Sequence, residues 1–386
     1  MRVRLGLLVA LLLVAAGAAP ARAQDAGPDG SRTALRVVVP DPDNLQYLSF
    51  WVALGAGYFD TEGFEVQISS PSFPAGVNEL LRREAAPVAV LPPPVYLELI
   101  ADKFPIRLVA NLLTNDGINL VVRRSVLEER HLSPTAPLGD RLRGMKGLKV
   151  GIAPGPVTRL RKLFASEGLV ADEQVDLAVM PGQDENDAFG KHRVDALYAH
   201  TPYLEKALVD QDGAILVNQS AGEVPSLSGL QIHVLCVTAS FAEEHADSVV
   251  GLARAVQRAQ TLLHTDRAAA TAAVLHALPK LEPRLVEPIV RIYEPAVPTG
   301  PQVSVERLAP ALALFPARKS QPSFEGLDLA TYVAPRFAEQ VARDAAAAAV
   351  TRTPPARPIS RTGIGAALAV LAAALVGVLV MLRRRR

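Results

Sequence analysis

The sequence has a single cysteine, Cys236, in 386 residues. An intramolecular disulfide therefore cannot form, and an oxidising compartment would not stabilise the chain in that way. Cys236 lies in the apolar run Val234–Val237, where a thiol behaves as a small buried hydrophobic group. No cysteine follows the apolar segment at the N-terminus, so a lipid cannot be attached there.

Several recurring signatures are also missing. The chain has no H-E-x-x-H, no P-loop and no G-x-S-x-G, so these classes of zinc protease, nucleotide hydrolase and serine hydrolase receive no support. It has no internal repeat at solenoid spacing. The sequence predicts no cofactor and no metal site, and an enzyme is only a minor alternative.

The first 23 residues predict a secretory signal peptide. Arg2 and Arg4 precede the apolar run Leu5–Ala16, and Ala21–Ala23 provides an A-x-A cleavage site. The apolar run is too short for a stable membrane span. An uncleaved anchor is the alternative interpretation.

A second apolar segment lies near the other end of the chain. Gly363–Leu382 comprises 20 uncharged residues, enough for a helix to cross a hydrocarbon core of ~30 Å. Arg383–Arg386 follow it, and the positive-inside rule places such a cluster in the cytoplasm. We therefore expect a transmembrane helix over 362–382 and a cytoplasmic arginine cluster at 383–386. The protein would be a single-pass protein of the cell (inner) membrane, with its folded domain on the periplasmic or extracellular side. A clipped sorting signal is the second interpretation of this tail.

The part between these segments lacks an excess of positive charge. Of 40 Lys and Arg residues, three lie in the predicted signal peptide and four in the tail, which leaves 33 basic against 39 acidic residues. The resulting net charge of about −6 argues against nucleic acid as a partner.

The stretch Asp43–Ile68 sets the pattern for the rest of the chain. It follows a strand-like run, Leu35–Val39, and apolar positions at helical spacing then extend from Leu45 to Ala56. Gly57 suits the left-handed position that closes a helix. Phe64–Ile68 alternates apolar and polar residues, as half-buried strands do.

Short strands and helices alternate after this stretch, which predicts parallel sheets. Expected strands are 87–91, 106–110, 148–152, 175–180 and 194–199, and expected helices are 75–84, 94–102, 157–168, 185–192 and 202–211. We interpret Arg130–Arg143 as the crossing into a second lobe and Gln231–Thr238 as the return. Ser240 and Glu243 predict a capping box before a long helix to about His264, with Asp266 capping the next helix.

The run N-L-x-Y-L-x-F-W-V-A, followed by G-Y-F-x-x-E-G-F-E-V, resembles the opening of a family of solute-binding proteins of ABC importers. This is the branch for nitrate, sulfonate, taurine and thiamine-pyrimidine precursors (SsuA/NMT1-like). Further matches, in order, are Val90–Pro94, Leu142–Ile152, Val194–Ala196 and Thr201–Tyr203, so the resemblance covers roughly residues 34 to 340.

The resemblance implies an α/β fold, a two-lobed periplasmic-binding-protein clamshell of type II, in which the ligand lies between strand-end loops of both lobes. The expected domains are lobe I at 34–118, lobe II at 119–236, the rest of lobe I with C-terminal helices at 237–340, and an Ala/Pro/Arg-rich linker without a core at 341–361. The expected partners are a small-molecule ligand, an ABC permease and its ATPase.

Strand-end loops supply the candidate ligand contacts. They are Asp43–Tyr47, Ser70–Gly76 and Leu91–Tyr96 in lobe I, and Pro154–Arg159 and Tyr198–Tyr203 in lobe II. The predicted ligand-binding residues are Asn44, Gln46, Tyr47, Ser70, Gly76, Pro93, Thr158, His200, Thr201 and Tyr203. Tyr47 and Tyr203 are suited to stack on a flat ligand, although each is equally interpretable as a packing aromatic. Asn44 is equally a helix N-cap. We interpret Arg159 as a solvated helix residue.

Two departures from the family pattern bear on the ligand. Prolines 92–94, 154 and 156 remove backbone N–H donors that anion-binding relatives offer at helix N-termini. Thr201 stands where aminosulfonate binders carry an acidic residue. Both favour a small, largely neutral organic ligand, such as a heterocycle held by tyrosines.

A membrane-tethered sensory or scaffold domain remains the second functional alternative. Related pyrimidine-synthesising enzymes carry a cysteine-rich metal motif that one cysteine cannot form.

Overall fold

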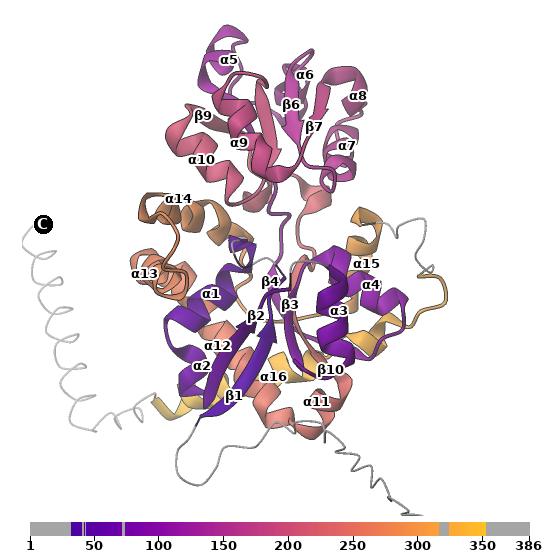
Figure 1. Ribbon diagram of the computed structural model, residues 1–386, viewed down its shortest axis with the longest axis vertical. Helices are drawn as coiled ribbons and strands as arrows, with labels where there is room; N and C mark the ends of the chain where they lie inside the picture. Colours follow the sequence, from indigo (N-terminus) through magenta and orange to yellow (C-terminus); the bar gives the residue numbers. More distant parts are fainter. Residues whose placement is uncertain (1–31, 41, 43, 72–73, 316–323, 353–386) are drawn as a thin grey trace, which may run out of the picture. The chain divides into compact units, whose positions relative to one another are not determined.

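The computed structural model describes residues 32–352, apart from 41, 43, 72–73 and 316–323 (Figure 1). The predicted signal peptide and transmembrane helix lie outside the described residues. Within the described part of the chain, no helix is both long and apolar enough to cross a membrane. The chain divides into two compact units between Val341 and Ala342, inside helix α16 (Pro335–Arg352), and both sheets belong to the first unit.

Two five-stranded sheets form the framework. Sheet A has the order β2-β1-β3-β10-β4, and sheet B the order β7-β6-β8-β5-β9. The strands of sheet A are β1 (Thr33–Val38), β2 (Phe64–Ser69), β3 (Val88–Leu91), β4 (Ile106–Leu113) and β10 (His233–Thr238). Those of sheet B are β5 (Asn119–Arg123), β6 (Lys149–Ile152), β7 (Asp176–Val179), β8 (Ala196–Ala199) and β9 (Gly213–Val217).

The chain passes between the sheets twice. The first crossing, residues 114–118, leads from β4 to β5, and the second, residues 218–232, leads from β9 to β10. The strand reached after each crossing, β5 or β10, is antiparallel to both of its neighbours. We call the part built on sheet A lobe I and the part built on sheet B lobe II. The predicted α/β architecture with two sheets is confirmed.

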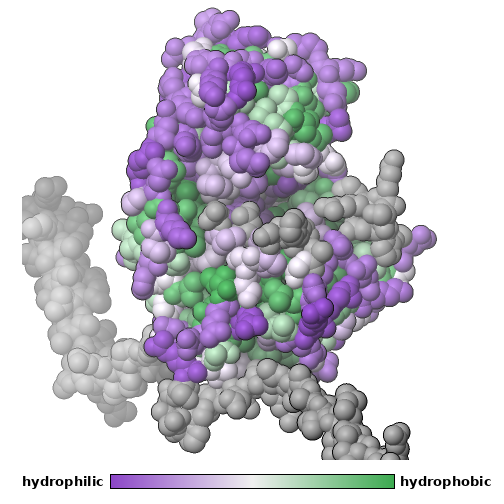
Figure 2. All heavy atoms as spheres, viewed as in Figure 1, coloured by the Kyte–Doolittle hydropathy of each residue, from purple (hydrophilic) through white to green (hydrophobic). Residues whose placement is uncertain are grey.

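Helices flank both sheets (Figure 1). In lobe I they are α1 (Leu48–Gly55), α2 (Tyr58–Thr61), α3 (Pro74–Arg82), α4 (Pro93–Ala101), α11 (Ala239–Glu244), α12 (Ala246–Thr265), α13 (Arg267–Ala277), α14 (Pro283–Tyr293), α15 (Val305–Leu314) and the start of α16. In lobe II they are α5 (Arg124–Glu129), α6 (Leu138–Arg143), α7 (Val157–Ala165), α8 (Ala171–Gln174), α9 (Gly182–Gly190) and α10 (Tyr203–Asp210). On the face in Figure 2, hydrophobic side chains form small, separate patches on a mainly hydrophilic surface.

The opening stretch folds as its pattern predicts. The Asn44 side chain accepts a hydrogen bond from the Gln46 N–H and so caps a 3₁₀ turn, Leu45–Tyr47, that runs into α1. Gly57 has a φ of 69°, the left-handed conformation that glycine adopts without strain. The helix is thereby ended, and the chain turns back into β2.

Two sequence interpretations are wrong. The crossing does not lie at Arg130–Arg143, because β5 already pairs with β8 and β9 of sheet B before that stretch. Most of the expected return crossing, Gln231–Thr238, is β10 itself, an interior strand of sheet A. The linker 341–361 stays a prediction: its described part continues helix α16 to Arg352, and the remainder lies outside the described residues.

The capping prediction at Ser240 is also wrong. Thr238 is the N-cap of α11, and its hydroxyl accepts the Phe241 N–H. Thr238 is also the last residue of β10, so the helix starts directly from the strand. The expected long helix is divided at His245 into α11 and α12. Asp266 caps α13 as predicted, through a hydrogen bond from the Ala269 N–H.

Candidate ligand-binding site

Three of the lobe I residues predicted to contact ligand, Asn44, Gln46 and Tyr47, are buried. Tyr47 is 0% exposed, and its ring packs edge-on against that of His233, with centroids 5.1 Å apart. The Gln46 side chain lies against Gly117 of the first crossing, where an added Cβ would come within 2.9 Å of it. Asn44 uses its side-chain oxygen as a helix cap, which is the alternative interpretation of this residue.

The lobe II residues His200, Thr201 and Tyr203 lie directly after β8. The His200 ring nitrogen Nδ1 is 2.5 Å from the Thr201 carbonyl oxygen, and its ring centroid is 5.8 Å from that of Tyr203. The Thr201 N–H donates to the hydroxyl oxygen of Tyr293 in lobe I, at 2.9 Å. Tyr203 is half-buried and packs on Gly182. The end of β8 therefore faces groups from lobe I.

The other four predicted residues are placed differently. Ser70 and Thr158 are exposed, and Gly76 is half-buried against Pro71. Pro93 is buried in the first turn of α4. A backbone N–H at this position has no partner within the helix, so the proline costs no hydrogen bond. Part of the Ser70–Gly76 loop, residues 72–73, lies outside the described residues. These four remain predictions.

An ion pair between lobe II and the first crossing is the feature that sequence reasoning missed. The Arg159 guanidinium, on the first turn of α7, lies 2.9 Å from the Asp116 carboxylate. The Asp116 side chain is 0% exposed and that of Arg159 is 13% exposed. The guanidinium also stacks over the Phe315 ring, with its carbon 4.9 Å from the centroid. The interpretation of Arg159 as solvated is wrong, because the crossing brings a buried acid to it.

Burial and charge together set the protonation of this cluster. Burial raises the pKa of Asp116 above its usual value, and the Arg159 charge partly opposes that rise. Burial, helped by the Arg159 charge, lowers the pKa of His200 to about 4, although the hydrogen bond with the Thr201 carbonyl partly opposes the fall. Burial likewise lowers the pKa of His233 to about 3, with added repulsion from Arg159 and His200. Both imidazoles are therefore neutral at pH 7, and each can donate one hydrogen bond and accept another.

Several buried polar atoms at this place lack a hydrogen-bond partner within the described part of the chain. They are Oδ2 of Asp116, Nε of Arg159 and Nδ1 of His233. A buried polar atom without a partner costs about 1–3 kcal/mol, so native proteins rarely leave one unsatisfied without a water or ligand to meet it. We name Tyr47, Asp116, Arg159, His200 and His233 the crossing cluster. It presents unused donors and acceptors from lobe I, lobe II and the first crossing at one place.

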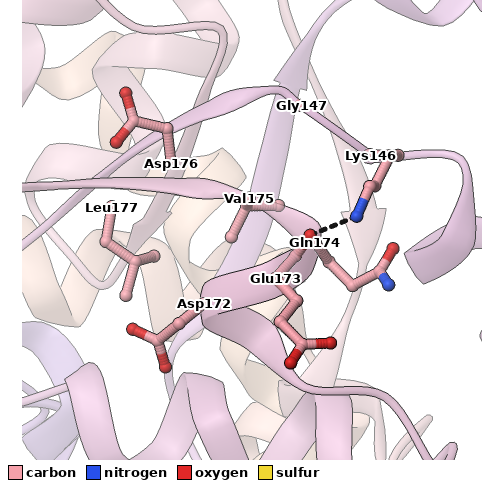
Figure 3. A pocket seen from close by; sticks show the side chains of 8 residues that line it. All are labelled: Lys146, Gly147, Asp172, Glu173, Gln174, Val175, Asp176 and Leu177. Atoms are coloured by element: carbon pink, nitrogen blue, oxygen red, sulfur yellow. Dashed lines mark hydrogen bonds between the residues drawn. The ribbon is translucent and has the colours of Figure 1, made fainter.

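A surface hollow of about 460 Å³ lies elsewhere on lobe II (Figure 3). It is lined by Lys146, Gly147, Asp172, Glu173, Gln174, Val175, Asp176 and Leu177. The Lys146 ammonium donates to the backbone carbonyl of Glu173 across it (Figure 3). Lys149 and Asp176 begin β6 and β7, so the hollow lies at the amino ends of these strands, whereas ligands of open α/β sheets bind at the carboxyl ends. The crossing cluster is therefore the better candidate.

Solved structures show the same fold. A protein of Bordetella bronchiseptica RB50 is 18% identical, with a TM-score of 0.59 over 81% of this chain and 98% of that one. The alkanesulfonate-binding protein SsuA of Xanthomonas axonopodis pv. citri, bound to MOPS, is 17% identical, with a TM-score of 0.53 over 79% and 99%. A mutant of the desulfurization enzyme DszB with biphenyl-2-sulfinic acid is 14% identical, with a TM-score of 0.50 over 81% and 99%.

Sheet B, built from the consecutive strands β5 to β9, is inserted between β4 and β10 of sheet A, so the chain crosses between the sheets twice. This arrangement and the similarity to solved sulfonate-binding proteins define a periplasmic-binding-protein fold. The model of the NMT1-like family matches residues 43–277, more than half of the chain, so the protein belongs to that family. The family predicted from the opening motif is thereby confirmed. No curated protein matches the sequence significantly.

Cys236 lacks the surroundings of a catalytic nucleophile. Cys236 is 0% exposed in the interior strand β10, and burial raises the pKa of its thiol far above the ordinary value. A thiol in that position is neither ionised nor accessible, as a nucleophile must be. Among the described residues, no three His, Cys, Asp or Glu side chains are grouped to hold a metal ion.

Proposed function

We propose that this protein is an extracytoplasmic solute-binding protein that captures a small organic molecule between its two lobes. It would deliver the molecule to an ABC permease and its ATPase. The observation that carries the proposal is the crossing cluster, where buried and unused hydrogen-bonding atoms from both lobes and the first crossing meet. Membership of the NMT1-like family and the periplasmic-binding-protein fold support it.

The charge of the crossing cluster favours a neutral ligand. Asp116 and Arg159 neutralise each other, and neutral His200 and His233 add no charge at pH 7. The free atoms include both an acceptor, Oδ2 of Asp116, and a donor, Nε of Arg159. A molecule with a neutral edge that carries one donor and one acceptor would satisfy both. The Tyr47 ring, packed on His233, is close enough to add an aromatic contact.

Tyr47 provides a direct test of this site. We expect Tyr47→Ala to weaken ligand binding by about 1–3 kcal/mol, because the aromatic contact area and the hydroxyl are lost together. Tyr47→Phe should lose about 0.5–1.5 kcal/mol, the value of one neutral hydrogen bond. Calorimetric titration with the co-purified ligand measures both losses. Full affinity in Tyr47→Ala would move the site away from this loop.

We further propose that residues 362–382 anchor the protein in the inner membrane, with the two lobes outside, and that residues 1–23 are removed on export. The support is the apolar run Gly363–Leu382 and the arginines that follow it. A fixed anchor suits a binding protein that stays beside its permease, and it suits a sensory domain equally. Uptake of the ligand by cells with and without the gene separates transport from sensing.

The anchor has its own test. The full chain should stay in the membrane fraction after a carbonate wash, whereas a chain lacking residues 362–386 should be released as a folded domain. Fractionation followed by circular dichroism measures both properties. Retention of the shortened chain in the membrane would contradict the assignment.

A further inference from the structure

Lobes I and II touch directly through α14 and α10, as well as through the crossings. Leu204 and Ala207 of α10 belong to the same buried apolar cluster as Ile289 and Val290 of α14. A contact of this kind must separate when the lobes open. Any polar group buried in it is then moved between protein and water.

Two polar links cross this contact. The Thr201 N–H, just before α10, donates to the Tyr293 hydroxyl at the end of α14. At the other end of α14, the Arg284 guanidinium is paired with the Asp210 carboxylate of α10. Tyr293 and Thr201 are both 0% exposed, whereas Arg284 is half exposed. The Tyr293 end is therefore the dry end of the contact.

A carboxyl group lies at that dry end. Glu205, in the first turn of α10, is 0% exposed, and neither of its carboxyl oxygens meets the geometry of a hydrogen bond to any described residue. Burial raises the pKa of Glu205 to about 8, although its own N–H and the nearby Thr201 hydroxyl partly oppose the rise. The same carboxyl acts on Tyr293, since its charge helps to raise the pKa of that phenol. Glu205 is thus within electrostatic reach of Tyr293 in lobe I.

No cation is paired with Glu205 among the described residues. On α14, Arg284 is already paired with Asp210 and Glu282, and Tyr293 is a neutral phenol. On α9, the acids are Asp184, Glu185 and Asp187, and Asp187 is paired with Lys191 and Arg193 at the surface. His200, in the loop before α10, is neutral because burial lowers the pKa of its imidazole. On β5, which packs on α10, the buried Arg123 guanidinium donates to the backbone carbonyls of Phe189 and Val194. A charged Glu205 would therefore be uncompensated in this contact.

We propose that closing lobe II onto lobe I takes up a proton at Glu205, so that the α10–α14 contact is a pH-sensitive latch on the ligand site. When the contact opens, water reaches the carboxyl and its pKa returns toward the ordinary 4.5. The latch regulates the site proposed above, but it operates on the lobes alone and does not require the ligand.

The direction of the pH effect follows from these two values. Below pH 4.5 the carboxyl is protonated in both arrangements, so the contact keeps its full stability. As pH rises from there through about 8, the open arrangement gains from ionisation and the closed one does not. The ratio of closed to open molecules should fall by up to about tenfold for each pH unit in this window. A ligand held by the closed lobes would be released as the pH rises.

The distance between the lobes, measured by spin labels on the full chain, tests the latch without any ligand. Glu79 on α3 and Glu128 on α5 are exposed and lie in different lobes, so cysteines placed there can carry the labels. The native Cys236 is fully buried and stays unlabelled. We expect a short distance at pH 5 that gives way to a longer one at pH 9.

Variants assign the effect to Glu205. Glu205→Gln keeps the shape and removes the charge, so it should hold the short distance at both pH values. If Glu205→Gln does not fold, Glu205→Leu is used as the uncharged variant instead. Glu287→Gln, at an exposed acid on α14, should respond as the unmutated chain does. A distance that does not change with pH in the unmutated chain, or one that lengthens equally in Glu205→Gln, would overturn the latch. Neither result would bear on ligand capture itself.

Discussion

Replacing Arg159 with methionine should destabilise the protein by about 3–5 kcal/mol at pH 8, because it leaves the Asp116 carboxylate buried without a cationic partner. Asp116 is 0% exposed, so water cannot replace the guanidinium. Methionine keeps much of the side-chain volume, and the loss therefore reports the missing charge more than a cavity. The measurement is urea unfolding of the full chain, followed by the fluorescence of the buried Trp51.

The loss should depend on pH in a defined direction. Burial already raises the pKa of Asp116, and without Arg159 only the hydrogen bond from the Ile118 N–H opposes that rise. A carboxyl with a raised pKa in the folded state is fully tolerated below its unfolded pKa and destabilises increasingly as pH rises through the folded pKa. The effect of Arg159→Met should therefore shrink toward pH 4. The double variant Asp116→Asn with Arg159→Met should recover most of the stability. An equal loss at pH 5 and pH 8 would contradict this explanation.

Replacing Gly55 with alanine should cost about 3 kcal/mol, at the upper end for overpacking. A Cβ on Gly55 would lie 1.8 Å from the backbone oxygen of Ala273 and 2.6 Å from its carbonyl carbon. Because these atoms belong to the backbone of α13, the helix itself must move. The matched control is Gly155→Ala, where an added Cβ meets nothing within 4 Å and stability should change by no more than about 0.5 kcal/mol.

The Gly55 variant also has a functional consequence. Helix α13 packs on both α1 and α14, and α14 carries Tyr293 of the interlobe contact. A displaced α13 should therefore weaken the contact as well as the fold of lobe I. Urea unfolding measures the stability, and the spin-label distance measures the contact. Unchanged stability in Gly55→Ala would show that α13 can move freely from α1.

Local pattern was enough to predict most of the framework. The period of the apolar residues identified α1 and β2, and Gly57 marked the end of the helix, because these features depend on neighbours within a few residues. The boundaries at the crossings were not predictable in this way. Leu120–Val122 has the composition of any buried strand, and only its pairing with β8 and β9 places it in sheet B.

The site was predictable only in part, for a similar reason. The loops after strands placed Tyr47 and His200 near the crossings, since carboxyl ends of parallel strands share one edge. Asp116 and Arg159 are 43 residues apart, and no local pattern indicates that they pair. Glu205 lies in the first turn of an amphipathic helix, where an acid is ordinarily a solvated, favourable residue. The absence of an acid at position 201 was therefore weaker evidence for a neutral ligand than the sequence alone indicated, because Glu205 brings a carboxyl close to Thr201.

Native mass spectrometry of the full chain, purified from its own host, tests ligand capture at the crossings most directly. The unmutated protein should carry a bound small molecule, and that molecule should be neutral once released. Tyr47→Ala should lose most of it, while Glu287→Gln, at an exposed acid on α14, should keep it. A spectrum that shows only the bare chain, or a molecule retained equally by Tyr47→Ala, would contradict capture at the crossing cluster.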